Sequence, residues 1–165
     1  MDIIKLSTDW AKAEVFSAKI VWLFSVIELL AAIGFWYWGR TSAAKAFIWP
    51  LLVMGLFLVS VGVGLYAANH PRIVQFENDC HREPKAFLEA EIQRTANSQR
   101  GLAMVFRILP AIVIVAAVVI LLAPAALWRA IAVTMILTAA FLMLVDSNTE
   151  ARNDAYHSQL LAFKP

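Results

Sequence analysis

A single carboxylate, Glu28, lies close to the middle of an apolar run that extends from residue 20 to residue 38. A charged side chain at the centre of a bilayer costs about 2.5–3.5 kcal/mol, so an acidic residue there is rare and usually has a role. One role is a site that binds a proton or a cation. The other is a protonated carboxyl group that hydrogen-bonds to a neighbouring helix and fixes its packing. Both roles require the Glu28 side chain to face other helices.

Two further polar residues are candidates for the surroundings of Glu28. Counting about 1.5 Å per helical residue from the outer boundary, Thr134 in the last apolar run comes to about the same depth. Arg129 lies nearer the outer boundary, but its long side chain can bend inward. Glu28, Thr134 and Arg129 are therefore the candidates for an intramembrane functional site.

A second polar pattern follows the last apolar run. Asp146, Glu150, Asp154 and His157 are spaced by four, four and three residues, so they line one face of a helix. Carboxylates and histidine in this arrangement can bind a divalent cation or act as an acid–base pair beside a lipid headgroup. A solvated helix face has the same pattern, and the nearby Arg152 favours that interpretation.

The other metal-ligand types do not form a recognisable site. Asp79, Cys80 and His81 are adjacent in sequence, which makes convergence on one ion difficult, and they lack CxxC or HxxxH spacing. Cys80 is the only cysteine, so it forms no internal disulfide. No glycine-rich phosphate loop or HExxH motif occurs. The sequence thus predicts no catalytic residue, no metal site and no cofactor.

Small residues recur at every fourth position near the end of the second apolar run: Ser60, Gly64 and Ala68. Such a series lets two helix backbones approach closely where lipid provides no hydrophobic driving force. It is explained either by packing within the chain or by an interface with another subunit. Four charged residues precede the third run: Glu89, Glu91, Arg94 and Arg100. They could contact lipid phosphates or a partner protein, but the sequence favours solvated charges with local ion pairs.

Four apolar runs of about 20 residues match the thickness of a bilayer core, and 61% of the 165 residues are hydrophobic. We predict an all-α integral membrane protein, a bundle of four transmembrane helices that forms one domain over residues 1–165. The expected segments are TM1 20–38, TM2 46–67, a cytoplasmic segment 68–104, TM3 105–123, TM4 125–145 and a cytoplasmic tail 146–165.

The helices are expected to extend beyond the membrane. The first has good N-cap residue types at Ser7-Thr8-Asp9, and Glu83-Pro84 is typical of a helix start. The second start would open an amphipathic cytoplasmic helix that leads into TM3 or lies on the membrane. The last helix would continue from Asp146 toward Leu160. Residues 67–82 are predicted to form a loop, and residues 162–165 a frayed end.

The distribution of basic residues predicts the orientation. Of the 14 Lys and Arg, only Arg40, Lys45 and Arg129 fall on one side of the four runs. The positive-inside rule places the other side, with both termini, in the cytoplasm. Compact outer connections and small size favour a bacterial inner membrane. A net charge of +2 without a basic cluster argues against nucleic acid as a partner.

For function, the sequence favours a protein that acts through protein–protein contacts, as an accessory, assembly or immunity-type subunit. Its partners would be the lipid bilayer and another membrane protein or a second copy. One alternative is an oligomeric transporter or channel subunit that uses Glu28 for a proton or cation. The other is a lipid-directed membrane enzyme that uses the cytoplasmic carboxylates and histidine, although the absence of a catalytic motif argues against an enzyme.

Overall fold

The computed structural model describes residues 3–163, which form helices joined by short connections. The helices are α1 (Ile3–Trp38), α2 (Ser42–Ala46), α3 (Ile48–Asn69), α4 (Arg72–Arg82), α5 (Pro84–Leu122) and α6 (Ala126–Ala162). Within this range, four helical stretches, containing α1, α3, α5 and α6, are long and apolar enough to cross a membrane. The predicted all-helical class and the four apolar helices are therefore confirmed.

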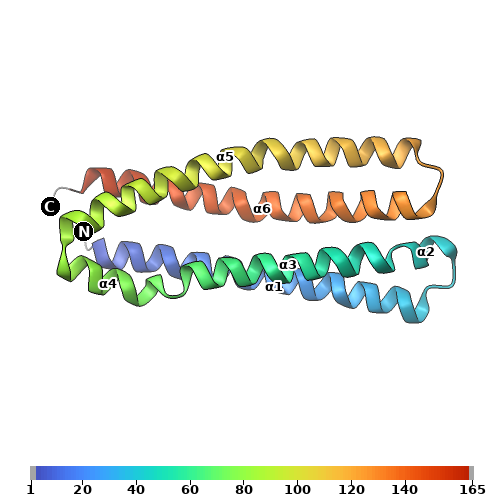
Figure 1. Ribbon diagram of the computed structural model, residues 1–165, viewed down its shortest axis with the longest axis horizontal. Helices are drawn as coiled ribbons and strands as arrows, with labels where there is room; N and C mark the ends of the chain where they lie inside the picture. Colours follow the sequence, from blue (N-terminus) through green and yellow to red (C-terminus); the bar gives the residue numbers. More distant parts are fainter. Residues whose placement is uncertain (1–2, 164–165) are drawn as a thin grey trace.

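The long helices form two antiparallel hairpins, one of α1 and α3 and the other of α5 and α6 (Figure 1). The two connections inside the hairpins lie together at what we call the loop end. The first and last described residues and α4 lie at the opposite end, the termini end (Figure 1). At the loop end, Thr41 caps α2 because its hydroxyl group accepts a hydrogen bond from the amide of Ala44 at 3.1 Å.

Two glycines of α3 allow close packing against α1. A Cβ atom at Gly55 would lie 2.8 Å from the side chain of Leu29, and one at Gly62 would lie 2.5 Å from the indole ring of Trp22. Ser25 reinforces the contact, since its hydroxyl group donates to the carbonyl oxygen of Gly55 at 2.9 Å. A second, longer hydrogen bond runs from the indole Nε1 of Trp22 to the carbonyl oxygen of Val59 at 3.4 Å. The first hairpin is thus held by small residues and two hydrogen bonds from side chain to backbone.

The apolar and charged parts of the long helices are continuous. α5 begins at Pro84, as predicted, and runs on through Pro110 without a break. The predicted start of the first helix at Ser7-Thr8-Asp9 is wrong, because α1 is already helical at Ile3. Ser7 lies inside the helix, where its hydroxyl group donates to the carbonyl oxygen of Ile3 at 2.8 Å. A serine can bond to the preceding turn as readily as it caps a new one.

The predicted loop over 67–82 is also wrong. α3 continues to Asn69, and α4 occupies Arg72–Arg82 after a turn at His70 and Pro71. Phe76 and Cys80 are one helical turn apart and are both buried. Glu77 and Asp79, which lie between them, hide this short apolar stripe, and it becomes evident only when α4 packs against the other helices.

The two hairpins meet mainly through α6, which packs against α1 and α3 as well as α5. The apolar part of α5 is the least covered by protein. In its most apolar stretch 6% of the residues are buried, compared with 28% for the corresponding stretches of the other three long helices. Most of this part of α5 is therefore available to lipid or to another protein.

Candidate functional site

Glu28 lies in the contact between α1 and α6. Its side chain is 1% exposed, and the hydroxyl group of Thr138 donates to its Oε1 atom at 2.7 Å. Its Oε2 atom has no hydrogen-bond partner among the described residues. Glu28 therefore joins the two hairpins with one hydrogen bond and leaves one buried oxygen atom without a partner.

Thr134 lies on the same face of α6 as Thr138, one turn closer to the loop end. It is 1% exposed, and its hydroxyl oxygen also has no hydrogen-bond partner in the described part of the chain. Buried polar atoms without partners are uncommon in proteins and call for an explanation.

Arg129 is not brought to Glu28. It is exposed at the loop end, where its Nε atom donates to the carbonyl oxygen of Ala123 at 2.7 Å. Since α5 ends with unpaired carbonyl groups at this point, the side chain closes the connection between α5 and α6. Of the three residues predicted to form the site, the structure thus buries Glu28 and Thr134 and directs Arg129 elsewhere.

Sequence reasoning missed Thr138. A count of residues from the outer boundary assigns Glu28 to the level of Thr134, but the hydrogen bond is made one turn further along α6. The available signal was the pair of threonines four residues apart on an otherwise apolar helix, because such a pair marks one polar stripe.

The polar face after the last apolar run mostly packs α6 against α5. The Nδ1 atom of His157 lies 2.6 Å from the hydroxyl oxygen of Thr95, and Asp154 accepts a hydrogen bond from Gln99 at 2.8 Å. Asp146 and Glu150 are half-buried further along the same helix. Within residues 3–163, no group of three or more acidic, histidine or cysteine side chains is placed to hold a metal ion.

The series of small residues on α3 faces away from the other helices. Ser60, Gly64 and Ala68 are all exposed, whereas Gly55 and Gly62 make the close contacts with α1. A Cβ atom built at Gly64 would meet no atom within 4 Å. We call the exposed surface of Ser60, Gly64 and Ala68 the α3 face, and it lies toward the termini end of the helix.

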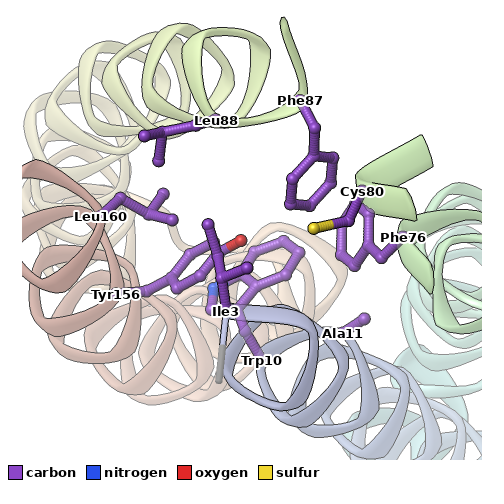
Figure 2. Packing of buried hydrophobic residues seen from close by; sticks show 9 residues of the cluster. All are labelled: Ile3, Trp10, Ala11, Phe76, Cys80, Phe87, Leu88, Tyr156 and Leu160. Atoms are coloured by element: carbon purple, nitrogen blue, oxygen red, sulfur yellow. The ribbon is translucent and has the colours of Figure 1, made fainter. Parts of the chain in front are cut away.

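An apolar cluster closes the termini end (Figure 2). Side chains from α1, α4, α5 and α6 converge there, and we call them the termini cluster. Its buried members are Ile3, Trp10, Ala11, Phe76, Cys80, Phe87, Leu88, Tyr156 and Leu160. The indole ring of Trp10 stacks on the phenol ring of Tyr156 with centroids 5.5 Å apart, so residues distant in sequence form one core.

A buried ion pair lies against this cluster, although its charges were predicted to be solvated. Glu91 is 5% exposed and binds Arg94 through two hydrogen bonds of 2.8 Å. The guanidinium carbon of Arg94 lies 3.9 Å from the centroid of the Trp10 ring, in the position of a cation–π contact. The predicted local ion pair is present, but the prediction of solvated charge is wrong for Glu91, because its carboxylate is buried against Tyr156 of α6.

Tyr156 links the ion pair to α1. Its hydroxyl oxygen lies 2.8 Å from Glu91 and 2.7 Å from the hydroxyl oxygen of Ser7. Tyr156 lies eleven residues beyond the apolar run that ends at residue 145, and therefore outside the membrane-spanning part of α6. Burial and the charge of Glu91 raise its pKa above the ordinary value for tyrosine, so the phenol keeps its proton and donates to the carboxylate.

A second ion pair joins the hairpins between the termini cluster and Glu28. Arg152 of α6 donates to Glu14 of α1 at 2.8 Å and to Ser17 at the same distance. Glu14 is 4% exposed. The polar contacts of α1 with α6 therefore form three levels along the helices, at Ser7, at Glu14 and at Glu28, and all three hold the hairpins together.

Comparison with known proteins gives no relative: no family model, no curated protein and no solved structure matches this chain.

Proposed function

We propose that this chain is a small polytopic membrane protein that works by contacting another membrane protein, as an accessory, assembly or immunity-type subunit. The observation that carries the proposal is the exposed α3 face of Ser60, Gly64 and Ala68, where a Cβ atom added at Gly64 would meet no atom of the described residues within 4 Å. We further propose that the membrane is the bacterial inner membrane and that both termini face the cytoplasm, in keeping with the distribution of Lys and Arg.

The physical argument concerns Gly64. Glycine in the interior of a helix lowers its stability by about 1 kcal/mol relative to alanine, and no described helix approaches Gly64 closely enough to require a residue without a Cβ atom. A small residue does not improve packing against lipid chains. It does improve packing against a second helix, because the backbone of that helix can approach the α3 face closely. A partner helix from another protein would therefore compensate for the weaker helix.

Replacement of Gly64 by leucine tests the proposal. Affinity-tagged protein is extracted from its native membrane in a mild detergent, and the retained proteins are identified by mass spectrometry and by native mass. We expect wild type to retain a stoichiometric partner. We expect Gly64→Leu to retain about tenfold less, the factor that a loss of 1.4 kcal/mol produces.

The matched control is Ala117→Leu, which enlarges an exposed small residue in the apolar part of α5 and should leave the partner bound. A wild-type protein that purifies as a monomer without any stoichiometric companion contradicts the proposal. Equal losses for the two variants contradict the assignment to the α3 face. A homo-oligomer that Gly64→Leu dissociates identifies a second copy of this chain as the partner.

A second candidate function rests on the unpartnered oxygen atoms of Glu28 and Thr134. We propose as this alternative an oligomeric transporter or channel subunit in which Glu28 takes up a proton or a cation. The test is a proton-flux assay on reconstituted vesicles, in which Glu28→Gln should abolish a flux that Thr134→Val only reduces. Equal flux for wild type and Glu28→Gln would exclude this role.

A further inference from the structure

An apolar groove runs along the surface between α5 and α6. It has a volume of about 480 Å³ and is lined by residues of both helices. Arg107 stands at the end toward the termini, and Trp128 stands at the end toward the loops. Between them the lining is aliphatic and includes Ala111, Val115 and Met135. We call this the α5–α6 groove.

The length of the groove is that of one lipid chain. Arg107 and Val119 are the first and last lining residues of α5, and twelve residues of helix extend about 18 Å at about 1.5 Å per residue. One leaflet of a bilayer has a hydrocarbon thickness of about 15 Å, half of the usual 30 Å. An acyl chain that enters beside Arg107 would therefore fill the groove along its length.

The charge at the entrance is unpaired. Arg107 is exposed, and no ion pair or hydrogen bond connects it to any other described residue. Arg100 is also exposed and lies seven residues earlier, on the same side of α5. Two guanidinium groups at the edge of an apolar stretch are complementary to a phosphate, and basic sites of this kind beside membrane helices bind anionic headgroups.

A second groove provides an internal comparison. It lies between α3 and α6, where it shares Ile131 and Met135 with the α5–α6 groove, and it has a volume of about 490 Å³. Its other lining residues are Trp49, Pro50, Val53, Met54 and Leu127. This groove is as large and as apolar as the first, but none of the charged residues in the described range 3–163 lines it. A lipid that prefers the α5–α6 groove must therefore be recognised through Arg107 rather than through apolar shape alone.

We propose that the α5–α6 groove is a binding site for one anionic phospholipid, with its phosphate on Arg107 and one acyl chain along α5. An apolar helix of another protein is a poorer occupant, because it would cover the guanidinium group without offering it a negative charge. This site is independent of the α3 face, which lies on the other hairpin.

Native mass spectrometry of the full chain tests the site. The protein in mild detergent is mixed with equal amounts of phosphatidylglycerol and phosphatidylcholine that carry the same acyl chains. We expect wild type to retain one phosphatidylglycerol in preference to phosphatidylcholine by about fivefold, as one basic residue at an anionic headgroup predicts. Arg107→Gln should abolish the preference, and Arg107→Lys should keep most of it.

Two matched pairs of variants separate charge from shape. Ala111→Phe fills the α5–α6 groove and should reduce phosphatidylglycerol retention, whereas Val53→Phe fills the uncharged groove and should not. Arg40→Gln removes an exposed charge at the loop end and should have no effect. Glycerol 3-phosphate should not compete, because it lacks the acyl chain.

Three results would overturn the proposal. The first is equal retention of the two lipids by wild type, and the second is an unchanged preference in Arg107→Gln. The third is full competition by glycerol 3-phosphate, which would reduce the site to a phosphate contact. Because Arg107 is exposed and has no partner in the described chain, its substitution should leave the fold intact, which circular dichroism would verify.

Discussion

Replacement of Glu91 by alanine is expected to lower the free energy of unfolding by about 2–4 kcal/mol, because removal of one partner strands the other charge of a buried pair. The lower part of that range allows for Arg94, whose side chain is 20% exposed. Without Glu91, the guanidinium group would remain over the Trp10 ring, and the hydroxyl group of Tyr156 would lose its charged acceptor. Denaturant titration in detergent micelles, followed by tryptophan fluorescence, measures the change.

The control is Glu89→Ala, two residues earlier on the same helix. Glu89 is exposed, and substitutions at exposed positions usually change stability by less than about 0.5 kcal/mol. Similar losses for the two variants would show that Glu91 contributes only helix propensity and surface charge. Tyr156→Phe should fall between them, since it removes the hydroxyl group that contacts Glu91 and Ser7 but keeps the stacked ring.

Replacement of Glu28 by alanine should lower the free energy of unfolding by about 3 kcal/mol, the sum of a small cavity and an unpaired hydroxyl group at Thr138. Glu28→Gln should lose less than about 1 kcal/mol, because the amide keeps the volume and still accepts the hydrogen bond through its oxygen atom. Thermal unfolding of purified protein in detergent compares the two variants with wild type.

Thr138→Val is the complementary variant, since it keeps the shape of the threonine and removes the donor to Glu28. It should cost about 1 kcal/mol, the usual net value of one hydrogen bond. Equal losses in Glu28→Ala and Glu28→Gln would contradict this interpretation, because they would mean that the acidic proton itself, and not the hydrogen bond, holds α1 to α6.

The helices could be predicted from the sequence because an apolar run of about 20 residues is a local property. α4 was missed because only Phe76 and Cys80 show its buried side. Glu91 and Arg94 resemble solvated charges in the sequence, and their burial depends on Trp10 and Tyr156, which are far away along the chain. Contacts of this kind are set by packing rather than by local pattern.

The candidate site could be predicted only in part for the same reason. Glu28 stands out because it is an acid within an apolar run, but depth counting treats the helices as parallel to the membrane normal. A tilt is enough to exchange Thr134 for Thr138 as the donor.

The two glycines of α3 show the same limit of the sequence, because Gly62 and Gly64 both lie in an apolar stretch with other small residues nearby. Only the position of Trp22 shows that Gly62 contacts α1 and Gly64 does not.

The hydrogen bond between Glu28 and Thr138 also bears on how the protein is made. The two residues are separated by 110 positions, so at about 5–20 residues per second a ribosome adds Thr138 some 5–20 s after Glu28. The first hairpin, whose contacts are local, can pair long before that time. The carboxyl group of Glu28 therefore has no donor from α6 until the second hairpin has been synthesised.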